Sequence, residues 1–324
     1  MAKTPTRRQH YVWRFHLAAW AVEGKIAVLR KDGKGFVTNP ANVAAERDFY
    51  RLPRLTDGDV EFIHAFIDHL PQGEELKSSA RGWLLNVSMA DWARRELDSH
   101  ADAHEARRAL EEFEIEADEN LMGAFELEGQ PLVQRLREED SSFRRADEDA
   151  TMRFSHFIAV QMLRTKGTAD RIGDGVLPSG HEGRLERTWP IFRHILASNV
   201  GFSIFTQRRE FTLRTVRASG GLRFITSDQP VVNLVAPIGD NDLALYLPVT
   251  PTVAVLLEHA DARSHVAVDA LSDDHVDQLN RRLFAEAHEQ VVGDDLTYLR
   301  SLSAEIVGPA ARSPASARQD RDGQ

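Results

Sequence analysis

Cysteine is absent from all 324 residues of the sequence. This absence excludes disulfide bonds, thiolate zinc sites and a cysteine nucleophile. It fits a reducing compartment, and we expect a cytoplasmic protein. The sequence also lacks an uninterrupted apolar run of about 18 residues, the length expected of a membrane-spanning helix. The N-terminus carries basic residues without an apolar segment behind them, so we expect neither a secretory signal nor a membrane partner.

The common signatures of phosphate and hydrolase sites are missing as well. No GxGxxG, P-loop, GxSxG or HExxH occurs in the chain. His100 and His104 have the i,i+4 spacing of a helical zinc site, but no glutamate follows His100 as in the metalloprotease motif. Arg95 and His100 match the loose Arg-x4-His spacing of a class of nucleotide-binding ribonucleases, which chance readily produces among 40 basic residues and 13 histidines. We therefore assign no metal ligands and leave the cofactor open.

The net charge of −10 does not predict attraction of the whole surface to nucleic acid. The charge is uneven, however. The charged residues among the first 35 are mainly Lys and Arg, whereas residues 96–149 are rich in Glu and Asp. A local basic face could therefore meet phosphates. The simpler alternative is that these charges only keep the surface hydrated.

The residues that are present predict an α+β protein. Residues 24–38 read as a β-hairpin around Asp32-Gly33, residues 211–257 read as several strands, and the middle of the chain has helical periodicity. The expected fold is a small mixed sheet from the N-terminal hairpin and the C-terminal strands, with a helical middle region. Because neither short set of strands would be stable alone, the hairpin should pair or pack with the strands of residues 211–257.

Local signals also set expected boundaries. Thr56 or Asp57 can cap a helix that ends before Pro71, and Gly129-Gln130-Pro131 predicts a break in the helical region that starts at Glu74. A further helix is expected over residues 272–293, with Ser272 as its N-cap and Gly293 after its end.

The domain organisation is expected to be simple. We predict one α+β domain over residues 7–308, with a helical insert at about 74–150. The composition of residues 309–324 is typical of a disordered tail.

The opening stretch RRQHYVWRFHLAAWA supplies the first candidate site residues. An exposed turn before an apolar run would place His10 at the edge of an element, where imidazole can act as acid or base. Arg14 follows within the same stretch and is a candidate for substrate binding. The alternative is a surface histidine beside a packed cluster of aromatic residues.

A second candidate pair lies in the apolar segment FIAVQMLR. Gln161 and Arg164 are three residues apart and share a face of the expected helix. A buried amide needs hydrogen-bond partners, and the planar guanidinium of Arg164 can bind a carboxylate or a phosphate. The alternative is a buried network with a purely structural role.

The third candidate is Ser227-Asp228, which directly follows an apolar strand in RFITSDQPVVN. Polar residues at strand ends are held rigidly and are well suited to functional sites. The alternative is an Asx-turn in which Asp228 caps its own loop.

Taken in order, five stretches resemble one bacterial protein family. They are RQHYVWRFHLAAWA, NPANVAAERDFY, FIAVQMLRT, FITSDQPVV and YLPVTP. The family is domain of unknown function forty-two thirty-eight, with a Gln-His-Tyr-Val-Pro-like opening, a Gln-x-x-Arg-Thr helix and a Ser-Asp-x-Pro strand end. Trp13 stands where that family usually has proline, and Trp20 where it usually has phenylalanine. The resemblance implies that His10, Gln161, Arg164 and Asp228 belong to a shared motif set, but it implies no reaction.

These candidates suggest a hydrolase acting on nucleic acid or a nucleotide. His10 and Asp228 are the expected catalytic residues, and Arg14, Gln161, Arg164 and Ser227 are expected to bind the substrate, because His with a carboxylate supports acid–base hydrolysis and arginine stabilises phosphoryl charge. The alternative is a non-catalytic ligand-binding or protein-interaction module. Side chains that converge in an open pocket would favour the first function, and buried, fully paired side chains the second.

Overall fold

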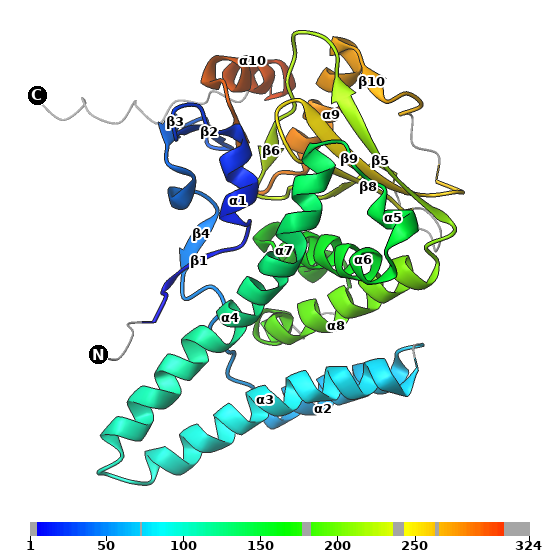
Figure 1. Cartoon of the computed structure of the whole chain (residues 1–324). Coiled ribbons are helices and arrows are strands. Elements are labelled where there is room, and N and C mark those ends of the chain that lie inside the picture. Colours follow the sequence, from blue (N-terminus) through cyan, green and yellow to red (C-terminus); the bar gives the residue numbers. More distant parts are fainter. Residues whose placement is uncertain (1–4, 72, 177–182, 236–242, 263–265, 308–324) are drawn as a thin grey trace, which may run out of the picture.

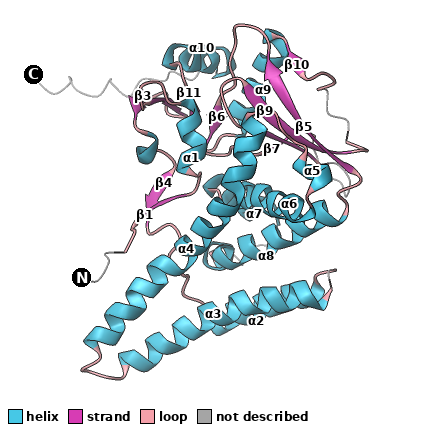
Figure 2. Ribbon diagram, in the orientation of Figure 1, coloured by secondary structure: helices cyan, strands magenta, loops and turns pink. Residues whose placement is uncertain are grey.

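The computed structural model describes residues 5–71, 73–176, 183–235, 243–262 and 266–307. Its class is α+β, as predicted. Strands gather in the upper half of the molecule, and long helices extend below them (Figure 1). Figure 2 shows that the middle layer between these two parts is helical.

The order of elements follows the expected sequence of strands, helices and strands. The first part contains β1 (Arg8–His10), α1 (Arg14–Leu17), η1 (Ala18–Trp20), β2 (Ile26–Arg30), β3 (Gly35–Thr38), η2 (Pro40–Asn42) and β4 (Ala45–Arg47). The middle contains α2 (Asp57–His69), α3 (Glu74–Asp98), α4 (His104–Arg137), α5 (Phe143–Ala146), α6 (Glu148–Leu163), α7 (Lys166–Val176) and α8 (Arg184–Thr206). The last part contains β5 (Phe211–Ala218), β6 (Thr226–Ser227), β7 (Val232–Asn233), β8 (Ala244–Pro248), β9 (Val253–His259), β10 (Ala270–Leu271), α9 (Asp273–Glu286), β11 (Gln290–Gly293) and α10 (Leu296–Val307).

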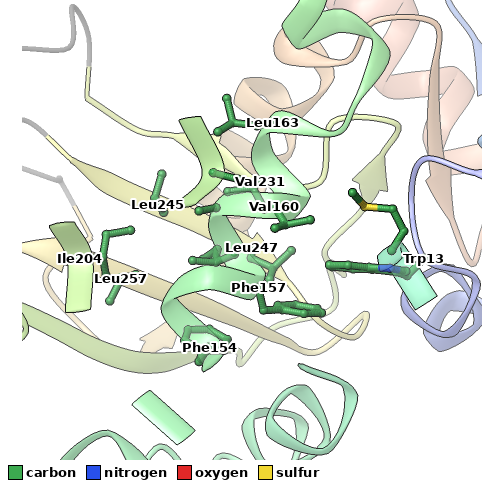
Figure 3. Close-up of a cluster of buried hydrophobic side chains, with 14 of the residues drawn as sticks. Trp13, Phe154, Phe157, Val160, Leu163, Ile204, Val231, Leu245, Leu247 and Leu257 are labelled. Carbon is green, nitrogen blue, oxygen red and sulfur yellow. The ribbon is translucent and has the colours of Figure 1, made fainter. Parts of the chain in front are cut away.

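The five-stranded sheet has the order β10-β5-β9-β8-β7 and is mixed, because β10 runs parallel to β5 while the other neighbours are antiparallel. Side chains on β8 and β9 alternate between two core clusters, as the period of two in a strand requires. Leu245, Leu247 and Leu257 share a cluster with α6 and α8 (Figure 3). Tyr246 and Leu256 share the other cluster with α9. The sheet is therefore a layer between these two groups of helices.

The four-stranded sheet has the order β3-β2-β11-β6 and is antiparallel. The predicted hairpin is confirmed as β2 and β3, with Gly33 in the left-handed region at φ 85°. The hairpin pairs with β11, which in turn pairs with β6. The expected single sheet is thus two sheets, and they pack together because Ala27 and Leu29 share a core cluster with Val216 and Leu256.

The helix predicted over residues 272–293 is too long, because α9 ends at Glu286 and residues 290–293 form β11. Both oxygens of Asp228 accept the backbone N–H groups of residues 288–290. A continuing helix would need those N–H groups for its own carbonyls. One such carbonyl, that of Phe284, instead accepts a hydrogen bond from Lys31 Nζ. Two side chains distant in sequence therefore end the helix.

The break predicted at Gly129–Pro131 is wrong, because α4 runs without interruption through Pro131. Leu132, Val133 and Leu136 beyond the proline are buried in the main core. Burial of this continued apolar stripe outweighs the backbone hydrogen bond that proline removes.

The predicted start of the helix before Pro71 is confirmed. Thr56 caps α2 in a capping box with Asp59.

The predicted helical insert lies within the described residues, whereas the predicted tail does not. Residues 74–150 are mainly helical, as expected, but their description as an insert in one domain stays a prediction. The predicted tail, residues 309–324, lies outside the described residues. Within the described ranges, no helix combines the length and the apolarity needed to cross a bilayer.

Candidate functional site

The end of β1 meets the end of α6 at the residues of the first two motifs. The backbone carbonyl of His10 accepts hydrogen bonds from Arg164 Nη2 and, at 3.1 Å, from the hydroxyl of Tyr50. Arg164 Nε donates to the same Tyr50 hydroxyl at 2.7 Å. Gln161 Nε2 donates to the carbonyl of Tyr11 at 3.4 Å. The two helix side chains therefore hold the backbone of residues 10 and 11.

These contacts leave part of each polar side chain unused. His10 Nδ1, Trp13 Nε1, Gln161 Oε1 and Arg164 Nη1 are buried without a hydrogen-bond partner. Gln161 and Arg164 are each only 2% exposed. The nitrogens of His10, Trp13 and Arg164 and the oxygen of Gln161 are thus unpaired near the contact between β1 and α6. Each unpaired buried group costs about 1 to 3 kcal/mol of folding free energy.

Arg164 is a buried cation without a close counterion. Its guanidinium lies 4.5 Å from the ring centroid of Trp13 and 5.2 Å from that of Tyr50. In the part of the chain that the structure describes, no carboxylate lies within ion-pair distance of it. Stacking on two aromatic rings stabilises the cation only in part.

Two half-buried carboxylates of α4 face this region. Burial raises the pKa of Glu119 to about 7, with opposition from Arg164 and support from Asp118. Burial also raises the pKa of Glu126, against the effects of Arg164 and Arg14. Glu119 and Glu126 are seven residues apart, so they lie on one face of the helix. The region therefore contains one carboxyl group, that of Glu119, that is poised to hold or release a proton near neutral pH.

The imidazole of His10 is neutral at pH 7. Burial lowers its pKa to about 4, and the charges of Arg8, Arg14 and Arg164 lower it further while a backbone hydrogen bond with Val43 opposes them. Arg14 itself is exposed at the start of α1. A neutral imidazole with an unpaired nitrogen can accept a proton.

Asp228 is in the same region, but its carboxylate is fully used. Its Oδ1 accepts the N–H of His288 at 2.9 Å, and its Oδ2 accepts those of Glu289 at 2.6 Å and Gln290 at 3.1 Å. It is 1% exposed, and its charge is one cause of the raised pKa of Tyr11, after burial. Burial raises the pKa of Asp228 itself, against these three hydrogen bonds. Such contacts are typical of a structural brace.

Ser227 is also turned inward. It is fully buried in β6, and its Oγ accepts the N–H of Gln229 at 3.0 Å. Gln229 Oε1 in turn accepts hydrogen bonds from Thr165 at 2.6 Å and from Arg171 at 3.0 Å. This network ties the segment after β6 to the segment after α6.

A buried ionic group that was not predicted from the sequence adjoins the motif residues. Asp118 on α4 accepts a hydrogen bond from Arg193 and contacts His194 Nε2 at 2.8 Å. Burial acts to raise the pKa of Asp118, but Arg193 and His194 bring it to about 2. The Arg193 guanidinium lies 4.7 Å from the Tyr50 ring centroid, so Tyr50 contacts both buried arginines.

A cavity of about 270 Å³ lies against this group. His194 and Asp118 line it, and the Trp83 ring stacks on His194 at 4.6 Å. The other lining residues are mainly apolar: Leu52, Pro53, Val87, Phe113, Ala117, Pro190 and Ile191, with Asn86. Arg193 and His194 within the apolar run WPIFRHILA were the available sequence signal, whereas Asp118 is inconspicuous among the many acidic residues of α4.

Comparison with known proteins gives a family. Residues 8–176 and 199–297 match the family described as protein of unknown function (DUF4238). The chain belongs to this family. No curated protein matches this DUF4238 chain, and no solved structure matches it.

Metal chemistry has no evident site among the described residues of the DUF4238 protein, where no group of three or more His, Cys, Asp and Glu side chains is placed to hold an ion. His100, one of the two histidines at zinc-like spacing, instead contacts the carbonyl of Glu96 and the hydroxyl of Ser99.

Asp228→Asn is expected to lower the free energy of unfolding by about 1 to 3 kcal/mol. Asparagine has one acceptor oxygen where Asp228 has two, so its amide would face at least one of the N–H groups of residues 288–290. Urea unfolding of the two proteins measures the difference.

Asp32→Asn is the matched control. Asp32 Oδ1 accepts the exposed N–H of Lys34 in the hairpin turn, a bond that asparagine makes equally well. Its stability should stay within about 0.5 kcal/mol of the wild type. An Asp228 variant as stable as this control would contradict the bracing role.

Proposed function

We propose that this DUF4238 protein is a cytoplasmic hydrolase that acts on a nucleotide or nucleic acid and holds a substrate phosphate at Arg164. The observation that carries the proposal is the buried guanidinium of Arg164, which has no carboxylate partner and an unpaired Nη1. An unpaired charge inside a protein is costly, and a bound phosphate would supply the missing counterion.

The surrounding groups fit the chemistry of phosphate-ester hydrolysis. Neutral His10 would take a proton from the attacking water as its oxygen forms a bond to phosphorus. Glu119, with a pKa of about 7, would give a proton to the leaving oxygen as the old P–O bond breaks. Gln161 and Arg14 remain proposed substrate-binding residues, because Gln161 Oε1 is unpaired and Arg14 is exposed near His10.

Asp228 and Ser227 change role in this proposal. Both have their oxygen atoms engaged by backbone N–H groups, so we assign them to positioning rather than to catalysis or substrate binding. The same observation favours the second candidate function, a non-catalytic ligand-binding module in which the motif residues hold the fold and Arg164 only binds an anion.

The test compares two arginines, the buried Arg164 and the half-buried Arg137. Arg164→Gln should weaken binding and turnover of the substrate about 10- to 100-fold, since a hydrogen bond to a charged group contributes about 1.5 to 3 kcal/mol. Arg137→Gln is the control, because Arg137, like Arg164, lies over an aromatic ring and donates to the backbone; its ring is that of Phe15, and its two acceptors are the carbonyls of Val249 and Phe15. Turnover is assayed with and without Mg²⁺ on nucleotides, a phosphodiester, and single-stranded RNA and DNA. Melting curves of the same variants report their stability.

Three outcomes separate the candidates. Turnover that is lost in Arg164→Gln and His10→Gln but kept in Arg137→Gln supports the hydrolase. Binding without turnover in the wild type supports the binding module. Equal losses of thermal stability in the two arginine variants, with neither binding nor turnover in the wild type, assign Arg164 to the structure alone.

A further inference from the structure

A second concentration of arginines lies at the opposite end of α6 from Arg164. A groove of about 1000 Å³ is formed around α5 and the end of α8. Arg144, Arg145, Arg208 and Arg209 all line it. Since the 16 residues of α6 span about 24 Å at 1.5 Å per residue, this groove is separate from the motif region.

The acidic residues of the groove are already paired with arginines outside it. Glu139 forms an ion pair with Arg217. Asp140 forms one with Arg135 at 2.7 Å and also accepts the backbone N–H of Ser142. These carboxylates therefore do little to neutralise the four groove arginines.

Three of the four groove arginines lack a carboxylate partner. Arg208 pairs with Glu148. Arg145 and Arg209 are exposed, and within the described ranges neither side chain makes a hydrogen bond or an ion pair. Arg144 donates to the carbonyl of Arg208 at 3.1 Å, and its Nε is buried without a partner. The groove thus presents an excess of guanidinium groups.

Burial and a neighbouring cation both disfavour the charged form of Arg144. Burial lowers the pKa of Arg144 to about 10, and the neighbouring charge of Arg208 lowers it further. Like charges at such proximity repel one another unless an anion lies between them. Planar guanidinium groups bind phosphate oxygens in pairs, which makes phosphate the anion best matched to this set.

We propose that this groove binds a compact ligand with several linked phosphates, of the size of a nucleoside triphosphate. Four arginines from two short segments exceed what one phosphate needs, and the groove is large enough for a nucleotide. A long nucleic-acid strand fits less well, because the net charge of −10 repels a polyanion that extends beyond the groove.

The probe is inorganic tripolyphosphate, which contains linked phosphates without a base. Arg145→Gln/Arg209→Gln should weaken its binding at least about tenfold in calorimetric titration, and more at low than at high salt. Both residues are exposed, so the fold should be retained. The control is Arg54→Gln/Arg300→Gln, which removes two other exposed arginines and changes the net charge equally.

Comparison of ligands then tests the chemical class. Tripolyphosphate and ATP should bind more tightly than orthophosphate and than a single-stranded DNA oligonucleotide. The proposal is wrong if the groove variant, the control and the wild type bind tripolyphosphate with equal affinity. Tighter binding of the oligonucleotide would replace the compact ligand with a nucleic-acid strand.

The inference is independent of the proposed hydrolase. Arg164→Gln should leave tripolyphosphate binding at the groove unchanged. The groove variant should leave any binding and turnover at Arg164 unchanged. Loss of tripolyphosphate binding in Arg164→Gln alone would move the phosphate site to Arg164 and remove it from the groove.

Discussion

Asp118→Asn is expected to lower the free energy of unfolding by about 3 to 5 kcal/mol. Asp118, Arg193 and His194 are 6%, 4% and 6% exposed, so all three side chains are shielded from solvent. An arginine side chain stays charged at any ordinary pH. The variant therefore leaves a buried cation without a counterion, and its Nε already has no partner.

Urea unfolding gives the magnitude, and two further variants make it interpretable. Asp140→Asn breaks an Asp–Arg pair in which the side chains are 41% and 37% exposed, so it should cost no more than about 1 kcal/mol. Asp118→Leu/Arg193→Met removes both charges and should be less destabilising than Asp118→Asn. A loss below about 1 kcal/mol for Asp118→Asn would contradict the expected cost of leaving Arg193 buried without its counterion.

Gly129→Ala is expected to cost about 3 kcal/mol, at the upper end for overpacking a core. A Cβ atom at this position would overlap the ring of Phe157 on α6. That ring is 3% exposed and stacks on Trp13 at 4.1 Å, so it has little room to move (Figure 3). The close approach of α4 and α6 therefore depends on the absence of a side chain.

Gly123→Ala on the same helix is the control. No atom lies within 4 Å of a Cβ built on Gly123. Alanine is favoured over glycine inside a helix by about 1 kcal/mol, so this variant should be as stable as the wild type or more stable. Opposite shifts in melting temperature for the two variants would locate the contact. Similar shifts would mean that helix propensity alone decides both.

Features encoded locally were predictable from the sequence. Thr56 signals the start of α2 by its own side chain, and Asp32-Gly33 signals the turn between β2 and β3. Such signals depend on residues within one turn of the backbone, so a single sequence contains all the information needed.

Features decided by distant contacts were not predictable. The end of α9 depends on Asp228 and Lys31, which are far from it in sequence. The continuity of α4 through Pro131 depends on burial against other helices. Tertiary packing overrides local preference at both positions.

The candidate site shows the same division. The motif residues His10, Gln161 and Arg164 do meet, but the contact between them runs through backbone carbonyls, which side-chain motifs do not reveal. Asp118 was not found because a buried aspartate and a surface aspartate have the same appearance in an acidic helix. Only the partners, here Arg193 and His194, distinguish the two.

Strand β11 has a consequence for how the chain folds during synthesis. It lies between the N-terminal hairpin and β6, so the four-stranded sheet cannot close until residues 290–293 have been made. Until then Ile26 and Val28, fully buried in the finished protein, lack the strand that covers one edge of β2. Pairing across such a sequence separation is slow because the loop-closure entropy is lost before the contacts form. The nascent chain therefore holds an unpaired strand edge for most of its translation, the kind of surface that chaperones protect from aggregation.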